Sequence, residues 1–236
     1  MRPRYTALED LLNQEREAFA QLLATIGPLP LRPMLARWDQ DWFPGMDAAM
    51  AYALVRKYRP RRIVEVGSGH STRFMAEAIA DGNLATKLTT IDPAPRTSIA
   101  GTGANLIRVP VPDCGEAPFE ELGSGDILFV DSSHVLMPGT DVDYLLNRIL
   151  PSLPTGTLVH FHDVFLPEDY PADWAWRGYN EQLGVAALLL GRAWRVLFSS
   201  HYAETRMPSE VAASAVGSVS LMPKARQSSL WLERGG

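Results

Sequence analysis

The stretch from Arg62 to Thr72, RIVEVGSGHST, constrains the fold of this chain more than any other. Its first part is rich in β-branched residues and is typical of a buried strand. Gly67 and Gly69 follow directly, and Ser71 and Thr72 then precede apolar residues at helical spacing. A strand, a glycine turn and a capped helix in this order predict the first half of a nucleotide-binding βαβ unit.

The glycine turn departs from the dinucleotide fingerprint, because a third glycine would be needed where Thr72 stands. Glu65, near the end of an otherwise apolar strand, suits a cationic or hydroxyl-rich ligand better than a pyrophosphate. Gly67 and Gly69 would let a ligand approach the backbone closely, and the helix N-terminus offers unpaired N–H groups. This segment resembles the first motif of class I S-adenosylmethionine-dependent methyltransferases. The alternative is a glycine turn without a ligand in an ordinary α/β domain.

Six more strands are expected after the first, at 87–91, 104–109, 125–130, 158–163, 194–198 and 228–232. Their alternation with helical patterns predicts a mostly parallel sheet with right-handed crossovers, closed by a hairpin with one antiparallel member. One amphipathic helix is expected over 5–26, as part of the domain, a dimer contact or a lid. A helix over 46–58 would carry Asp47 in its first turn, where a carboxylate favours the helix dipole. The segment 199–227 has no assignment.

Polar residues follow the expected strands where each strand ends. Asp92 comes about 25 positions after Gly67, at a point where an acidic residue binds a ribose hydroxyl in dinucleotide sites. A turn residue before proline is the alternative for Asp92. The fourth and fifth strands lead to Asp131, His134, His162 and Asp163. With the strand order 3-2-1-4-5, these ends lie side by side at the edge where open α/β sheets bind ligands.

The chain resembles, within the class I methyltransferases, the small-molecule group called methyltransferase family 24. Asp131-Ser-Ser-His134 after strand four and His162-Asp163 after strand five carry this likeness, which extends roughly over 47–181. It implies a Rossmann-like α/β class I methyltransferase fold with a mostly parallel seven-stranded sheet and helices on both faces. It also implies methyl transfer from S-adenosylmethionine. The implied cofactor-binding residues are Glu65, Gly67, Ser68, Gly69, Ser71, Asp92, Asp113 and Asp131.

Methyl transfer is an in-line displacement, so the protein positions two reactants and removes a proton from the acceptor. His134 or His162 would act as base, because histidine titrates near neutral pH, and Asp131 would lie between cofactor and acceptor. Related O-methyltransferases hold a divalent metal at this edge, and the matching residues here are Asp131, His162 and Asp163. Magnesium prefers oxygen ligands, so His162 leaves metal dependence open. His160, deeper in its strand, is expected to be a hydrogen-bonded core residue.

The length of 236 residues suits one α/β domain with an appendage. We expect a helical extension over 1–45 and the methyltransferase-like domain over 46–236. Cys114 is the only cysteine, which excludes an intrachain disulfide and fits a cytoplasmic location. A net charge of −5 disfavours nucleic-acid binding, and no apolar run suits a signal peptide or a membrane span. The expected partner is a small-molecule acceptor, with a homodimer as a further expectation.

Two other functions remain open beside methylation, for which oxygen is favoured over nitrogen as the acceptor atom. An NAD(P)-dependent oxidoreductase on a similar fold is disfavoured by the missing third glycine and by Glu65. A catalytically silent binding module is disfavoured because a scaffold has no need of two histidines and two aspartates at one sheet edge. The identity of the acceptor cannot be read from the sequence.

Overall fold

The protein is described by a computed structural model that covers residues 5–30 and 33–236. Residues 1–4 and 31–32 lie outside the described residues. The first group belongs to the N-terminal segment for which no signal peptide is expected, and the second to the expected N-terminal extension. The strands are β1 (Arg62–Val66), β2 (Lys87–Ile91), β3 (Asn105–Ile107), β4 (Ile127–Val130), β5 (Leu158–Phe161), β6 (Trp194–Ser199) and β7 (Leu230–Arg234).

These strands form one seven-stranded sheet in the order β3-β2-β1-β4-β5-β7-β6. β7 runs antiparallel to both of its neighbours, β5 and β6, and the remaining pairs are parallel. β4 is apolar and buried on both faces, as the middle of a parallel sheet requires. The predicted strands, their order and the single antiparallel member are therefore confirmed.

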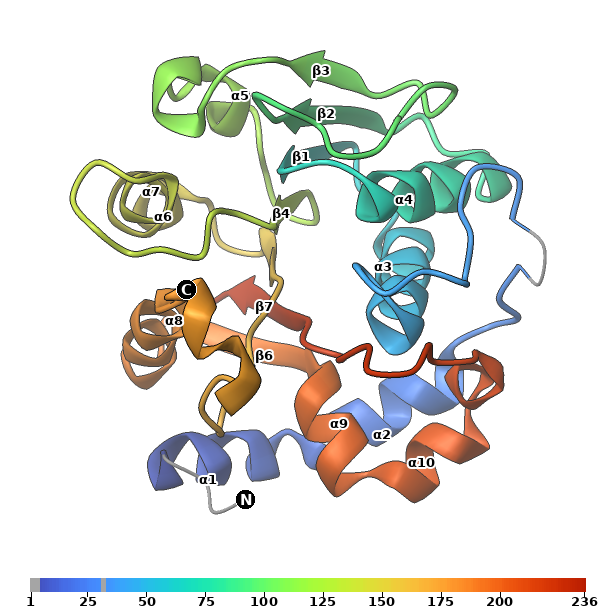
Figure 1. Cartoon of the computed structure of the whole chain (residues 1–236). Helices are drawn as coiled ribbons and strands as arrows, with labels where there is room; N and C mark the ends of the chain where they lie inside the picture. Colours follow the sequence, from blue (N-terminus) through green and yellow to red (C-terminus); the bar gives the residue numbers. More distant parts are fainter. Residues whose placement is uncertain (1–4, 31–32) are drawn as a thin grey trace.

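Helices cover both faces of the sheet (Figure 1). On one side lie α3 (Gly45–Tyr58) and α4 (His70–Asp81). On the other side lie α6 (Asp141–Tyr144), α7 (Leu150–Ser152) and α8 (Glu181–Leu190). A π-helical turn, η2 (Leu145–Ile149), joins α6 to α7. The helix predicted from Asp141 to Leu150 is therefore present, with a π-helical segment in its middle. The shorter elements between strands are η1 (Val111–Cys114), α5 (Ala117–Glu120) and η3 (Ala172–Arg177).

The single helix predicted near the N-terminus is wrong. Two helices, α1 (Thr6–Gln14) and α2 (Arg16–Thr25), are separated by a break at Glu15. The apolar stripe is continuous in the sequence but packs on two different surfaces. α1 contacts α8, whereas α2 contacts β6, where the ring of Phe19 lies 5.6 Å from that of Phe198. A straight helix would not reach both surfaces.

The unassigned segment between β6 and β7 is also helical. It contains α9 (Ser200–Arg206), α10 (Pro208–Ala213) and the short turn η4 (Ala215–Ser218). α10 packs on α2, so the N-terminal helices and this insertion lie together at the β6 end of the molecule (Figure 1). The domain boundary expected at residue 45 stays a prediction. Across the described ranges, none of the helices has the length and apolar character needed to cross a membrane.

Candidate active site

The turn between β1 and α4 brings the backbone very close to β4. Gly67 has a φ of +84°, and a Cβ atom there would lie 2.3 Å from the carbonyl oxygen of Asp131. Its N–H donates to the oxygen of Ile91 in β2, while the N–H of Asp131 donates to Val66 in β1. The turn thus lies where β1 separates β2 from β4 and the strand order reverses, the point at which open α/β sheets bind ligands.

The close approach at Gly67 gives a first testable prediction. We expect Gly67→Ala to lower the free energy of unfolding by about 3 kcal/mol or more, because the added methyl group collides with backbone and the positive φ is strained. Chemical denaturation of the purified variant measures this loss. Gly103→Ala is the matched control, since Gly103 has a φ of +73° and nothing within 4 Å of the added Cβ. Equal losses in the two variants would show that the collision with Asp131 is unimportant.

Glu65 braces the glycine turn from inside the protein. Its carboxylate is fully buried and accepts hydrogen bonds from Ser71 Oγ and Thr72 Oγ1, each at 2.6 Å. Burial raises the pKa of Glu65 to about 8 against the effect of these hydrogen bonds, and the nearby charges of Asp131 and Asp92 act in the same direction as burial. Glu65 and Ser71 thus contact each other. Glu65 holds the glycine turn through these buried hydrogen bonds and is not exposed at the edge of the sheet.

The other predicted cofactor residues lie around the same edge. Ser68 Oγ donates to Asp92 Oδ2 at 2.7 Å, and the N–H of Ala94 donates to Asp92 Oδ1 at 2.8 Å. These bonds join the glycine turn to the end of β2. Asp113 lies in η1 after β3, and within the described residues its carboxylate has no hydrogen bond or ion pair to the turn. The cofactor roles of these residues stay predictions.

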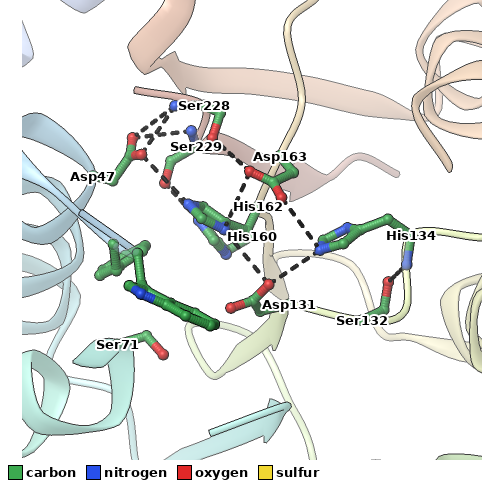
Figure 2. Close-up of polar contacts among 12 residues, drawn as sticks. Asp47, Ser71, Asp131, Ser132, His134, His160, His162, Asp163, Ser228 and Ser229 are labelled. Atoms are coloured by element: carbon green, nitrogen blue, oxygen red, sulfur yellow. Dashed lines mark hydrogen bonds and ion pairs between the residues drawn. The ribbon is translucent and has the colours of Figure 1, made fainter. Parts of the chain in front are cut away.

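The predicted catalytic residues meet at the ends of β4 and β5 (Figure 2). Asp131 Oδ1 lies 3.2 Å from His134 Nε2 and 3.5 Å from His162 Nδ1. Asp163 lies behind them, with its two carboxylate oxygens 3.6 Å from His134 Nε2 and 3.7 Å from His162 Nδ1. Both histidines are buried, whereas the side chain of Asp131 is 35% exposed. Asp131 is therefore the member of this group that faces the open edge.

Two residues of this cluster have strained backbone. His134 has a φ of +59° and Asp163 a φ of +54°, in the left-handed region that non-glycine residues rarely adopt. The conformation of His134 is held by bonds on both sides of its peptide: its N–H donates to Ser132 Oγ at 3.1 Å, and its carbonyl oxygen accepts from the N–H groups of Asn180 and Glu181. In this strained backbone conformation, the ring of His134 points toward Asp131.

Glu181, the first residue of α8, completes the environment of His134. Its Oε2 lies 2.8 Å from His134 Nδ1, and its Oε1 accepts a hydrogen bond from Ser132 Oγ at 3.0 Å. Glu181 is buried, so this carboxylate fixes the proton of the ring on Nδ1 and directs Nε2 toward Asp131. Glu181 stands in the first turn of α8, where a carboxylate is ordinary, so no local sequence signal reveals this contact.

The charges in the cluster alternate. Burial alone would lower the pKa of His134, but hydrogen bonds with Asp131 and Glu181 outweigh it and raise that pKa well above the ordinary value. The charges of Asp163 and Asp131 raise the pKa of His162 in the same way. Burial would raise the pKa of Asp131, but the two imidazoles outweigh it and hold that pKa well below its usual range. At neutral pH, Asp131 is thus an ionised carboxylate between two imidazolium groups.

Asp47 belongs to this network, although its position in α3 indicated only an interaction with the helix dipole. It is fully buried and accepts the backbone N–H groups of Ser228 and Ser229, at 2.9 and 3.0 Å. Its Oδ2 also lies 3.5 Å from His162 Nε2. No local sequence pattern could reveal this contact, because Asp47 and Ser228 are 181 positions apart. Asp47 ties α3 to the segment before β7 and holds His162 between two carboxylates.

His160 has the core role predicted for it. Its Nε2 is 2.8 Å from Ser229 Oγ, and its ring stacks on Phe129 with a centroid distance of 3.7 Å. Burial, followed by the positive charge of His162, lowers the pKa of His160 well below its ordinary value. The neutral ring of His160 therefore lies within the sheet, and of these two histidines only His162 lies at the end of β5.

The residues predicted as metal ligands lie together in this cluster. In the described part of the chain, no group of three or more histidine, cysteine, aspartate or glutamate side chains is arranged to hold one. Asp131 and Asp163 instead pair with Nδ1 of His162. The metal role expected for Asp131, His162 and Asp163 stays a prediction, and no step below uses a metal.

Comparisons with known proteins agree with this geometry. A family model described as a methyltransferase domain matches residues 64–164. A provisionally assigned O-methyltransferase from Klebsiella pneumoniae has 14% identity and a TM-score of 0.51, over 96% of this chain and 90% of that one.

The O-methyltransferase TomG from Streptomyces achromogenes, which is involved in tomaymycin synthesis and was solved with S-adenosylmethionine, has 17% identity and a TM-score of 0.51, with the same coverage. At these identities the likeness to both structures shows the fold alone. Comparison with curated proteins gives no match. The segment matched by the methyltransferase-domain model holds the glycine turn, β4 and the polar end of β5, and the chain has the Rossmann-like fold of the class I methyltransferases.

Proposed function

We propose that this enzyme methylates an oxygen atom of a small molecule, with His134 as the base that removes the acceptor proton. The observation that carries the proposal is the pairing of a partly exposed carboxylate, Asp131, with a buried histidine whose second nitrogen is held by Glu181. A base held by a third group on its far nitrogen is the arrangement that hydroxyl activation requires.

The cofactor, when bound, supplies a methyl group on a positively charged sulfur. The residues present fit this cofactor, because the glycine turn lies at the switch point of the sheet and the carboxylates of Asp92 and Asp131 follow the two strands beside it. The Ser68–Asp92 pair would bind the ribose hydroxyls, and Asp113 would lie along the adenine. Glu65 and Ser71 would hold the loop in shape, and Asp131 would bind the amino-acid end of the cofactor.

The acceptor hydroxyl would lie against Asp131 and His134. Since Glu181 fixes a proton on Nδ1 of His134, the nitrogen that takes the acceptor proton is Nε2, which lies beside the partly exposed Asp131. The carboxylates around the ring stabilise the imidazolium that forms. His162 stays protonated between Asp47, Asp131 and Asp163 and holds Asp131 in place, so it would act as a positioning residue rather than as a second base.

Oxygen is favoured as the acceptor atom because a hydroxyl has a pKa well above 7 and needs such a base. The two structural relatives are described as O-methyltransferases, which supports the same reaction class. Mass analysis of products from hydroxyl and amine acceptors tests this preference directly.

Calorimetric titration with S-adenosylmethionine, S-adenosylhomocysteine and NAD tests the cofactor site. We expect both sulfur nucleotides to bind, and Asp92→Ala to weaken their binding at least tenfold, a loss of about 1.4 kcal/mol, because the ribose hydroxyls lose their acceptor.

Asp173→Ala is the control for this titration, since Asp173 is an exposed carboxylate in η3 that pairs with Arg226. It should leave cofactor binding unchanged. Binding of NAD in place of the sulfur nucleotides would overturn the proposal in favour of an oxidoreductase. If none of the three ligands bound, the result would favour a catalytically silent binding module.

A further inference from the structure

Arg177, at the end of η3, has an unused hydrogen-bonding edge beside the candidate active site. Its Nη1 donates to the hydroxyl of Tyr179 at 3.1 Å and lies 3.9 Å from Asp163 Oδ2. Its Nε is buried and has no hydrogen-bond partner among the residues that the structure describes. A buried donor without an acceptor costs free energy, so an arginine left in this state calls for an acceptor that arrives with a ligand.

Aromatic rings restrict where that acceptor can lie. The guanidinium carbon of Arg177 is 4.0 Å from the ring centre of Trp174, 5.4 Å from Trp176 and 5.3 Å from Tyr179. These rings lie against the guanidinium and Nη1 already donates to Tyr179, so the donors for which the described residues provide no acceptor are Nε and Nη2, which form one in-plane edge. This edge is a rigid two-donor fork that matches the two oxygens of a carboxylate.

The guanidinium group of Arg177 is close to the proposed base. Asp163 Oδ2 lies 3.6 Å from His134 Nε2 and 3.9 Å from Arg177 Nη1, so both cationic groups approach the same oxygen atom. The ring of His134 also lies 4.6 Å from that of Tyr179, which contacts Arg177 in turn. One small molecule can therefore reach the arginine edge with one substituent and the base with another.

Trp176 supplies an aromatic surface at the same place, because its side chain is 80% exposed while it lies beside the guanidinium. An exposed indole beside this guanidinium offers a surface on which a flat ring can stack. An aliphatic acid would use the charge of Arg177 but not the ring.

We propose that the methyl acceptor is a small aromatic hydroxy acid, whose carboxylate binds the Nε/Nη2 edge of Arg177 and whose hydroxyl lies at His134. This inference rests on the proposed O-methylation for the position of the hydroxyl. In the reaction, the acceptor oxygen bonds to the methyl carbon while the sulfur–methyl bond breaks, and its electron pair stays on the sulfur. The hydroxyl proton passes to Nε2 of His134, and the carboxylate is unchanged.

The test compares hydroxybenzoates with the hydroxybenzamides of the same substitution pattern, which are similar in shape but replace the charged two-oxygen acceptor by a neutral amide. For each pair, kcat/KM for methylation and the affinity for the complex with S-adenosylhomocysteine are measured. We expect the wild-type enzyme to prefer the acid by at least 30-fold in one or more pairs. Arg177→Gln should reduce this preference to less than threefold, and Arg177→Lys should retain part of it, because lysine keeps the charge and loses the fork.

Arg148→Gln is the matched control, since Arg148 also lies over an aromatic ring, 5.8 Å from that of Tyr144, but on η2. It should leave the preference unchanged. Melting curves establish whether each variant is folded. If Arg177→Gln does not fold, Arg177→Lys takes its place in the comparison.

Three results would overturn the inference: equal use of acids and amides, a preference that survives in Arg177→Gln, or a methyl ester as the product. Absence of preferential binding of every acid to the S-adenosylhomocysteine complex would overturn it as well. Failure of the proposed function is a separate result, in which neither sulfur nucleotide binds the folded protein.

Discussion

Replacing His134 with glutamine is expected to lower kcat by about 10²–10⁴-fold, the usual contribution of a general base. Glutamine keeps a polar group near Asp131 and Glu181 but cannot take a proton from the acceptor. Affinity for S-adenosylmethionine should change little, because the glycine turn and Asp92 lie on the other side of Asp131. Single-turnover rates at saturating acceptor, beside calorimetric titration of the cofactor, separate the two effects.

Glu181→Gln tests the same base through its partner. The base must be neutral to work, and its pKa is raised by Asp131 and Glu181, so the rate should rise with pH above the ordinary histidine range. Removing the charge of Glu181 lowers that pKa. The rising limb of the pH profile should therefore move to lower pH, while the plateau rate falls roughly tenfold or more because the ring is less well held. A purely structural role for Glu181 would lower the rate without moving the limb.

His201→Gln is the control for both variants. His201 also pairs with a buried glutamate, since its Nε2 lies 3.0 Å from Glu168 Oε2, but this pair lies in α9 and the loop after β5. Its loss should leave kcat within about twofold of the wild-type value, since the pair holds no group of the site. If His134→Gln behaved like this control, another group would have to be the base, and His162 would be the first to test.

The fold was predictable because its signals are local. Strands β1, β2 and β4 are short apolar runs, each followed by turn residues, and their alternation with helices fixes a parallel sheet and its crossovers. The strand ends then had to meet at one edge, which is why Asp131, His134 and His162 come together as expected. The break at Glu15 was missed because an amphipathic stripe records which residues are apolar, not which surface each one meets.

The partners of the two histidines could not be predicted, for a different physical reason. Asp47 and Glu181 each stand in the first turn of a helix, where a carboxylate is ordinary. What distinguishes them is burial against an imidazole that another part of the chain supplies, and no local pattern carries that information. The metal set stays a prediction for a related reason, because residue types alone do not show whether two carboxylates share an ion or pair with an imidazole ring.

The stability of the cofactor-free enzyme should depend on pH through Glu65, the buried carboxylate under the glycine turn. Its pKa is about 8 in the folded protein and 4.5 as an ordinary value, mainly because of burial. The folded state therefore binds the proton more tightly than the unfolded state does. The contribution of protonated Glu65 is fully present below about pH 4.5 and is lost progressively as the pH rises to about 8.

Glu65→Gln isolates this contribution, because glutamine has nearly the same shape and cannot ionise, and the hydroxyls of Ser71 and Thr72 can still bond to it. At about 1.4 kcal/mol for each unit of pKa shift, its free energy of unfolding should gain on the order of 4 kcal/mol relative to wild type between pH 4.5 and 8.5. Urea denaturation across this range measures the difference.

The control for this experiment is Glu121→Gln, at an exposed carboxylate whose pKa is lowered by a hydrogen bond from Arg62. Its stabilising effect has the opposite sign of pH dependence, since it is present at neutral pH and disappears as the pH falls below the ordinary value. A difference between Glu65→Gln and wild type that stays constant from pH 4.5 to 8.5 would mean that the folded protein holds Glu65 ionised. The glycine turn would then rest on a charge rather than on a neutral hydrogen-bonded carboxyl group, and the fixed negative charge beside Asp131 would have to be counted in cofactor binding.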